Sequence, residues 1–287
     1  MITQSARQKR KMISSILEAS IRREVKEKNV ALLLSGGVDS MSLGFAASRV
    51  GKHVVAYSFK TDQHDSYDYE KAQQVSETMG WDFVGVVVNT EDLKKDFYKL
   101  LDLGCVKKTQ FECTYPFLHL YPEIVEHSVL SGIAADGWYG LSKKAKMNFI
   151  KTKESFDGFR REYFNAENPA GVLNLLSLSS IYNKKLVHPY LWDKKVEHYF
   201  MEYDWNELNK PEQKRHVREA FKEEFEMVGH VNQHTNLQLD SKINILFESL
   251  LDDLEINFKD RSRVMDVCRD WAGLKEFHDN NQISFNL

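Results

Sequence analysis

Residues 35–40 carry the pattern with the most chemical content in the chain, SGGVDS. They follow the apolar run 30–34 and precede residues with helical apolar spacing, so the expected local order is strand, glycine turn, helix. Gly36 and Gly37 allow the backbone to approach an anion closely, and the N–H groups that begin the helix would point at the same place. This order of elements is typical of a phosphate-binding turn.

Asp39, inside this turn, adds a divalent cation to the expected ligand. A carboxylate beside a phosphate would repel it unless a cation lay between them, and Mg²⁺ is commonly held by one or two carboxylates together with phosphate oxygens. The hydroxyls of Ser35 and Ser40 can donate further hydrogen bonds. The six residues therefore predict a magnesium-bound polyphosphate or pyrophosphate. They match neither G-x-x-x-x-G-K-[ST] nor G-x-G-x-x-G.

The elements that must hold this turn alternate between strand and helix in the first half of the chain. Strand patterns fall at 30–34, 53–59, 83–88 and, more briefly, 129–130, and helix patterns fall at 39–50, 69–79 and 91–101. Near-continuous β-branched runs separated by helices predict an α/β fold, a parallel twisted sheet with helices on both faces. The turn would then lie at the carboxyl end of the first strand, where ligands bind in open α/β sheets.

Strand signals fade after about residue 142, and polar helices are expected at 151–164, 171–183, 192–203, 212–227 and 241–254. We predict an N-terminal helix at 1–29, a nucleotide-binding α/β core at 30–142, and a mainly helical substrate-side region at 143–287 that packs on the core. No Gly/Ser linker separates them.

Composition excludes several classes of protein. The formal charge of −3 and the pI near 6.4 give no global attraction to nucleic acid or to acidic membranes. No apolar run approaches the ~18 residues of a membrane span. The three cysteines, Cys105, Cys113 and Cys268, have no C-x-x-C spacing, which argues against zinc and iron–sulfur sites. Their low, odd number fits a reducing compartment, and we expect a cytoplasmic protein.

Three segments together resemble a known family. SGGVDS resembles the pyrophosphate loop (PP-loop) of the N-type ATP pyrophosphatases, which include asparagine synthetase, GMP synthetase, NAD synthetase, argininosuccinate synthetase and several tRNA-modifying enzymes. LSGIAADGWYG at 130–140 resembles the L-S-G-x-G-A-D-E-x-F-G-G stretch of the synthetase domain of asparagine synthetase. LVHPYLWD at 186–193 resembles the R-V-P-F-L-D segment of that family. The first motif is specific, the second moderately so, and the third is weak alone. The resemblance covers roughly residues 25–255 and implies an adenine nucleotide alpha hydrolase-like fold.

The resemblance implies an ATP-dependent, AMP-forming ligase. ATP would bind with its β- and γ-phosphates on the PP-loop and with Mg²⁺ held by Asp39 and Asp136. A small-molecule carboxylate would attack the α-phosphate to give an acyl-adenylate and pyrophosphate, and ammonia or another amine would then displace AMP. The implied nucleotide-binding residues are Leu34, Ser35, Gly36, Gly37, Val38, Asp39, Ser40, Ser58, Ser131 and Gly132.

The family also places a lysine near the transferring phosphate, on a loop late in the domain. Lys242 is our first choice as the third catalytic residue beside Asp39 and Asp136, because the polar stretch 234–242 precedes a helix. The other late basic residues are Lys214, Arg215 and Arg218.

The chain departs from the family at two points. Gly137 stands where the family has Glu, so one carboxylate is missing or is supplied from elsewhere, with Glu112, Glu123, Asp193 and Glu197 as candidates. Fewer than 35 residues precede the PP-loop, so we expect no glutamine-hydrolysing domain. Ammonia would come from solution or from a separate glutaminase subunit, or the nucleophile would be a different amine.

Two other functions stay open. The same adenylation could modify a nucleobase or a tRNA, although the acidic charge balance argues against a large RNA. Alternatively, Gly137 could mark a nucleotide-binding protein that has lost catalysis.

A separate acidic cluster, Asp62, His64, Asp65 and Asp68, could bind a metal; we favour a solvated loop in which Asp65 or Asp68 caps a helix.

Overall fold

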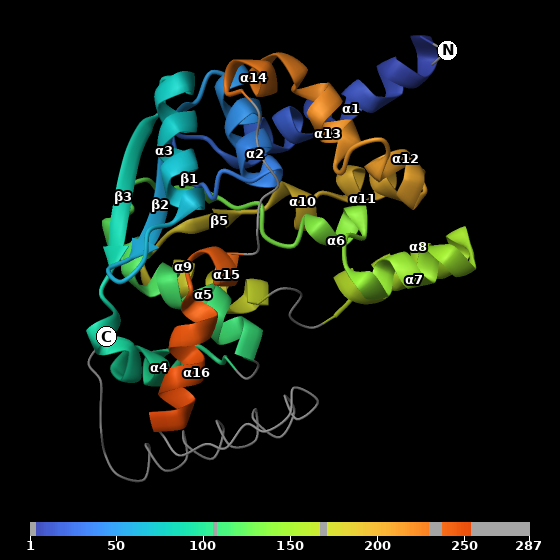
Figure 1. Cartoon of the computed structure of the whole chain (residues 1–287). Coiled ribbons are helices and arrows are strands. Elements are labelled where there is room, and N and C mark those ends of the chain that lie inside the picture. The colour runs from blue at the N-terminus through green and yellow to red at the C-terminus, as the bar shows by residue number, and fades with distance from the viewer. Residues whose placement is uncertain (1–3, 106–107, 167–170, 230–236, 254–287) are drawn as a thin grey trace.

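Strand β1 (Asn29–Leu33) occupies the middle of a parallel sheet. The strand order is β3-β2-β1-β4-β5, and every neighbouring pair is parallel. The other strands are β2 (His53–Thr61), β3 (Asp82–Val88), β4 (Ser128–Leu130) and β5 (Lys185–Val187). The computed structural model describes residues 4–105, 108–166, 171–229 and 237–253. Helices flank both faces of the sheet (Figure 1), so the predicted α/β fold is confirmed.

Alternate residues of β1 point to opposite faces of the sheet, and helices cover both faces. Val30 and Leu32 belong to one buried apolar cluster, whereas Ala31 and Leu33 belong to a second. Because neither face meets water, the strand is a continuous apolar run without polar alternation.

Two sets of helices build these clusters. The first set is α1 (Gln4–Glu24), α2 (Val38–Arg49), α3 (Tyr67–Met79), α6 (Asp136–Tyr139), α10 (Pro189–Trp192), α11 (Lys194–Met201), α12 (Trp205–Asn209) and α13 (Arg215–Ala220). The second set is α4 (Leu93–Asp102), α5 (Lys108–Leu120), α9 (Val172–Ile181) and α16 (Ile243–Asp253). No helix in the described ranges combines the length and apolar character that crossing a bilayer requires.

Helices α7 (Lys143–Lys151) and α8 (Lys153–Phe164) pack against each other and project from the side of the molecule in Figure 1. The sequence pattern predicts one helix over 151–164, but the backbone of Thr152 is extended and its side chain caps α8. The remaining elements are α14 (Lys222–Met227), α15 (Leu237–Asp240), η1 (Thr90–Asp92) and η2 (Tyr121–Glu123).

Strand β5 lies in the half of the chain where strand signals fade. It has only three residues, and it is held by parallel pairing with β4. Such a short strand leaves too little alternation to distinguish it from a helix or loop. The predicted division into units at 29/30 and 142/143 stays a prediction.

Candidate active site

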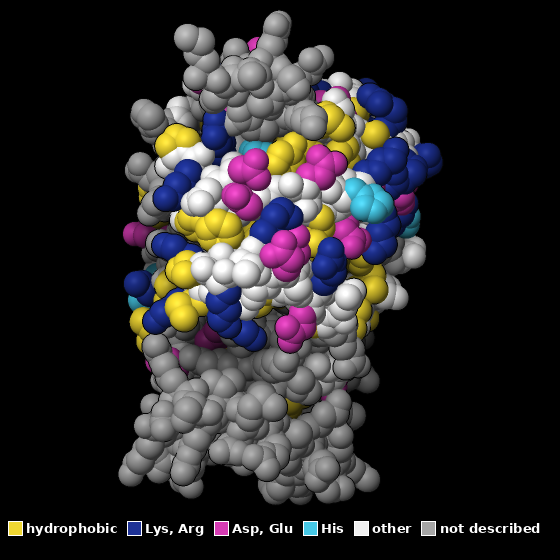
Figure 2. Space-filling model, turned by 90° about the vertical axis from the view of Figure 1, so that its right-hand side faces the viewer, with side chains coloured by type: hydrophobic (Ala, Val, Ile, Leu, Met, Phe, Trp, Pro, Cys, Tyr) yellow, Lys and Arg dark blue, Asp and Glu magenta, His cyan; other side chains and the backbone are white. Residues whose placement is uncertain are grey.

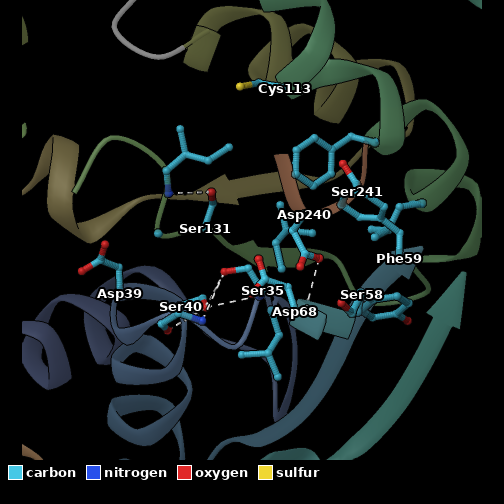
Figure 3. A pocket seen from close by; sticks show the side chains of 18 of the residues that line it. Ser35, Asp39, Ser40, Ser58, Phe59, Asp68, Cys113, Ser131, Asp240 and Ser241 are labelled. Carbon is cyan, nitrogen blue, oxygen red and sulfur yellow. Dashed lines mark hydrogen bonds between the residues drawn. The ribbon is translucent and has the colours of Figure 1, made fainter. Parts of the chain in front are cut away.

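A cavity of about 360 Å³ opens at the carboxyl end of the sheet, within the size range of small-molecule sites. Figure 3 shows Asp39 and Ser40 at one end of it and Ser58 and Phe59 at the other. Its lining comes from segments far apart in the sequence: Leu33, Leu34, Ser35, Gly37, Asp39, Ser40, Tyr57, Ser58, Phe59, Ser66, Asp68, Cys113, Phe117, Leu120, Ser131, Gly132, Ile133, Ala134, Asp136, Lys214, Asp240 and Ser241.

The PP-loop joins β1 to the start of α2. Gly36 adopts a left-handed backbone with φ of +65°, which glycine reaches without a steric penalty. Ser40 donates its hydroxyl hydrogen to Gly37 O at 3.1 Å, and Ser35 N donates to Ser40 Oγ at 3.3 Å. These bonds fix the shape of the loop, and α2 then presents the N–H groups of its first turn toward the cavity. A loop of this shape can hold an anion.

Lys214 joins the two carboxylates that the sequence assigns to a metal. Its Nζ lies 2.6 Å from Asp39 Oδ2 and 2.6 Å from Asp136 Oδ1. Burial alone would lower the pKa of Lys214, but the charges of Asp39 and Asp136 and their hydrogen bonds raise it above its ordinary value. The ammonium therefore stays charged, and it places positive charge beside the PP-loop.

The turn before α13 holds Lys214 in place. Lys214 has a left-handed backbone with φ of +58°, and its N–H donates to Asn209 Oδ1 at 3.3 Å. The amide of Asn209 donates in turn to Tyr139 O at 2.8 Å, which ties this turn to α6. The ring of Tyr139 lies 5.6 Å below the ammonium. Lysine pays a conformational cost in this backbone region, and such outliers concentrate at functional sites.

Gly132 allows the second motif to approach the PP-loop. A Cβ added at Gly132 would lie 3.0 Å from Ser40 N and 3.2 Å from Asp39 Cβ, closer than ordinary packing. The neighbouring Ser131 accepts a hydrogen bond from Ile133 N at 3.3 Å, which holds the turn that follows β4. The glycine therefore allows Asp136 to lie on the same side of the cavity as Asp39, where both contact Lys214.

The structure shows what occupies the space beside Gly137. A Cβ added there would lie 2.4 Å from Cε1 of Tyr163 and 2.9 Å from Cζ of Phe164. Phe164 also stacks on Trp138 with 3.7 Å between ring centroids. The aromatic end of α8 thus fills the place into which a larger side chain at 137 would project.

The four candidates for the missing carboxylate do not line the cavity. Glu112 is buried, and Asp193 caps α11 and pairs with Arg23 at 3.0 Å. Glu123 is exposed, and Glu197 pairs with Lys194. The carboxylates that do line the cavity are Asp39, Asp68, Asp136 and Asp240.

Asp68 and Asp240 line the cavity although neither is a predicted site residue: Asp68 is expected in a solvated loop, and Asp240 lies in the polar stretch 234–242 that points to Lys242. Ser66, and not Asp65 or Asp68, caps α3 by accepting from Tyr69 N at 3.1 Å. Asp240 Oδ2 accepts from Ser66 Oγ at 2.5 Å and from Asp68 N at 3.3 Å, which joins α15 to the start of α3 (Figure 3). Asp68 is therefore buried at the cavity rather than solvated in a loop.

Most of the sequence-predicted site residues lie on the cavity wall: Leu34, Ser35, Gly37, Asp39, Ser40, Ser58, Ser131, Gly132 and Asp136. Gly36 and Val38 belong to the loop but do not line the cavity. Lys242 is exposed and lies outside the lining, whereas Lys214, the alternative named after it, lies within it. The lining residues Cys113 and Phe117 are not among the predicted site residues, and Ser241 lies in the polar stretch 234–242 that points to Lys242.

The donor set fits a magnesium ion that arrives with a phosphate ligand. Two carboxylates, Asp39 and Asp136, converge on one point, and Mg²⁺ typically uses one or two carboxylates plus phosphate oxygens. Among the residues that the structure describes, no group of three or more His, Cys, Asp or Glu side chains could hold a metal.

Comparison with known proteins gives a family match. The sequence model of the asparagine synthase family matches residues 12–242, more than half of the chain. No curated protein is significantly similar in sequence. Among solved structures, NMN synthetase from Francisella tularensis is 14% identical, with a TM-score of 0.42 over 98% of this chain and 97% of that chain. The U34-tRNA thiolase NcsA from Methanococcus maripaludis, solved with its 4Fe–4S cluster, is 11% identical, with a TM-score of 0.33 over 93% and 80%.

Proposed function

The chain belongs to the asparagine synthase family, whose members use ATP and act on small molecules, and we propose that it is an AMP-forming carbon–nitrogen ligase. It would activate a carboxylate as an acyl-adenylate for attack by ammonia or another amine. The observation that carries this proposal is the ammonium of Lys214, held between Asp39 and Asp136 beside the PP-loop. A fixed cation and a helix N-terminus at one end of a cavity suit a polyphosphate.

The two ends of the cavity suit the two ends of ATP. The β- and γ-phosphates would lie on the PP-loop near Asp39, and the adenosine would lie toward Ser58 and Phe59. Asp240 and Ser241 line the cavity away from Asp39, toward Phe59 (Figure 3), and offer oxygen atoms for hydroxyl or amino groups. The substrate carboxylate would approach the α-phosphate from the side of Ile133 and Cys113.

The chemistry would proceed in two displacements. A carboxylate oxygen attacks the α-phosphorus, the bond from that phosphorus to the bridging oxygen breaks, and pyrophosphate leaves with the electron pair. The amine nitrogen then attacks the acyl carbon, loses a proton, and expels AMP. Holding the attacking oxygen, the phosphorus and the leaving oxygen in line is the main contribution of the protein.

Lys214 can stabilise the phosphates without leaving its carboxylates. An ammonium has three N–H donors, and two of them point to Asp39 and Asp136, so a third can serve a phosphate oxygen. Together with the N-terminus of α2 it would stabilise the charge that develops on the leaving pyrophosphate. Mg²⁺ held by Asp39 and Asp136 would neutralise the same charge as a Lewis acid.

One observation favours a second function, a nucleotide-binding protein without turnover. The family Glu is replaced by Gly137, and Tyr163 fills the adjoining space, so this chain lacks that carboxylate. A large RNA substrate has less support. On the face shown in Figure 2, Lys and Arg side chains are interspersed with Asp and Glu, whereas RNA binding requires a continuous basic surface.

The experiment is a screen for pyrophosphate and AMP release from Mg-ATP. The panel contains amino acids, dicarboxylic acids and deazapurine carboxylic acids, each with ammonium, and Asp39→Asn is the control. Release that requires one acid and disappears in the variant supports the ligase and names the acid. Production of ADP and phosphate contradicts the ligase. Tight ATP binding without turnover on any acid, and without RNA-dependent activity, supports the second function.

A further inference from the structure

Lys71, on α3, is a buried lysine that the chemistry proposed above does not use. The residue is 7% exposed, and within the described ranges its Nζ has no hydrogen-bond partner. A buried ammonium without acceptors is costly, because it loses the hydrogen bonds of its water shell and gains no hydrogen bonds in return. A methionine of similar length would fill the same space without that cost. The position of the charge therefore requires an explanation.

The side chain of Lys71 lies directly on the PP-loop. A Cβ added at Gly36 would be 3.0 Å from both Cγ and Cδ of Lys71, so the lysine stem covers this glycine. Side chains on a helix lean toward its N-terminus, and the ammonium lies 5.9 Å from the ring centroid of Tyr67, one turn earlier. The stem of Lys71 therefore lies against the PP-loop near the start of α3, where Ser66 and Asp68 line the cavity; Lys71 itself lies behind that lining.

The charges around Lys71 leave it short of negative partners. Burial is the largest effect and lowers its pKa to about 8; the charge of Asp68 raises this pKa, and that of Arg218 on α13 lowers it. Arg218 is itself paired with Glu212 at 3.3 Å. An anionic ligand on the PP-loop would supply the acceptors that the protein does not provide.

We propose that Lys71 binds the terminal phosphate of ATP, and afterwards the pyrophosphate product, from the α3 side of the PP-loop. Lys214 would approach the same phosphates from α13, so two lysines on different helices would share the charge of the leaving group. This inference rests on the proposed function, since it assumes that ATP binds with its terminal phosphates on the loop. It makes Lys71 a determinant of polyphosphate over monophosphate binding.

The test compares three ligands on variants that keep the lysine stem but remove its charge. Lys71→Met is the main variant, and Lys71→Gln is a second neutral variant in case the first does not fold. Lys222→Met is the matched control, because Lys222 is 62% exposed on α14 and pairs only with Glu226 among the described residues. Calorimetric titration gives the dissociation constants for Mg-ATP, Mg-pyrophosphate and AMP, and thermal unfolding checks the fold.

We expect Lys71→Met to lower the affinity for Mg-ATP and Mg-pyrophosphate by about 10- to 100-fold, which is the range of one hydrogen bond to a charged group. The affinity for AMP should not change. The control should bind all three ligands like the wild type. Unchanged pyrophosphate affinity in a folded variant, or an equal loss for AMP, would overturn the inference and leave Lys71 a structural residue. If the wild type binds none of the three ligands, the proposed function itself fails.

Discussion

Lys214 donates a hydrogen bond of 2.6 Å to Asp39, although 175 residues separate them in the sequence. The bond joins α13 to the PP-loop and closes one end of the cavity. Because Lys214 lines the cavity and Lys242 does not, we propose that Lys214 takes the place of the late family lysine.

We therefore expect Lys214→Met to reduce acid-dependent pyrophosphate release by about 100-fold or more, as removal of one preorganised donor to a developing anion does. Lys242→Met should have a small effect, since its side chain is exposed. Both variants are assayed at saturating Mg-ATP with the acid found in the screen. The reverse order of effects would restore Lys242 as the catalytic lysine.

The affinity for pyrophosphate should depend on pH through Lys71. Burial lowers the pKa of Lys71 to about 8, with Asp68 raising it and Arg218 lowering it, so the free protein loses this charge between about pH 7 and pH 9. Deprotonation removes the attraction, and the wild-type affinity should fall as the pH rises. The quantity to measure is the ratio of wild-type to Lys71→Met affinity, because the ionisation of pyrophosphate cancels in it. A ratio that stays constant over this interval would contradict the prediction.

Introducing the family glutamate at position 137 should destabilise the fold. A Cβ at position 137 would lie 2.4 Å from Cε1 of Tyr163, which is too close for normal packing. Overpacking of this kind lowers the free energy of unfolding by about 1–3 kcal/mol. We expect a lower melting temperature for Gly137→Glu and recovery when Tyr163→Ala is added. Gly158→Glu is the matched control, since an added Cβ at Gly158 meets nothing within 4 Å. Equal melting temperatures for Gly137→Glu and the wild type would refute the steric account.

Asp240→Ala should lower the affinity for AMP and for ATP by the same factor, whereas Lys71→Met should lower only the affinity for ATP. Asp240 accepts from Ser66 Oγ and from Asp68 N at the cavity wall, so its loss would loosen the link between α15 and α3. We expect a several-fold loss of affinity for both nucleotides, because the two hydrogen bonds that disappear lie within the cavity wall and not on the ligand. Titration with AMP and Mg-ATP measures it. A loss confined to ATP would place Asp240 at the phosphates instead.

The local elements of the first half could be predicted from sequence because each carries its own signal. Helices α2, α3 and α4 begin and end within two residues of the predicted bounds, since apolar periodicity and glycine turns are local. The PP-loop and Asp136 followed from motifs of the same local kind.

The rest of the site depends on which distant segments meet, and sequence periodicity does not encode that. The sequence offers Lys214 only as an alternative, because nothing near it shows that α13 packs beside the PP-loop. The sequence favours a solvated loop for Asp68, because its burial depends on α15, whose Asp240 follows 172 residues later. Tyr163 could not be connected with Gly137, because only the packing of α8 brings them together.

The hydrogen bonds among Ser35, Gly37 and Ser40 have a consequence for the energetics of ligand binding. A loop that already has internal partners loses its conformational entropy when the chain folds, and not when a nucleotide arrives. Nucleotides of different length would then meet the same rigid cradle. Discrimination among them would come from the side chains around it, and the loop itself would act as a fixed reference point in every step of the reaction.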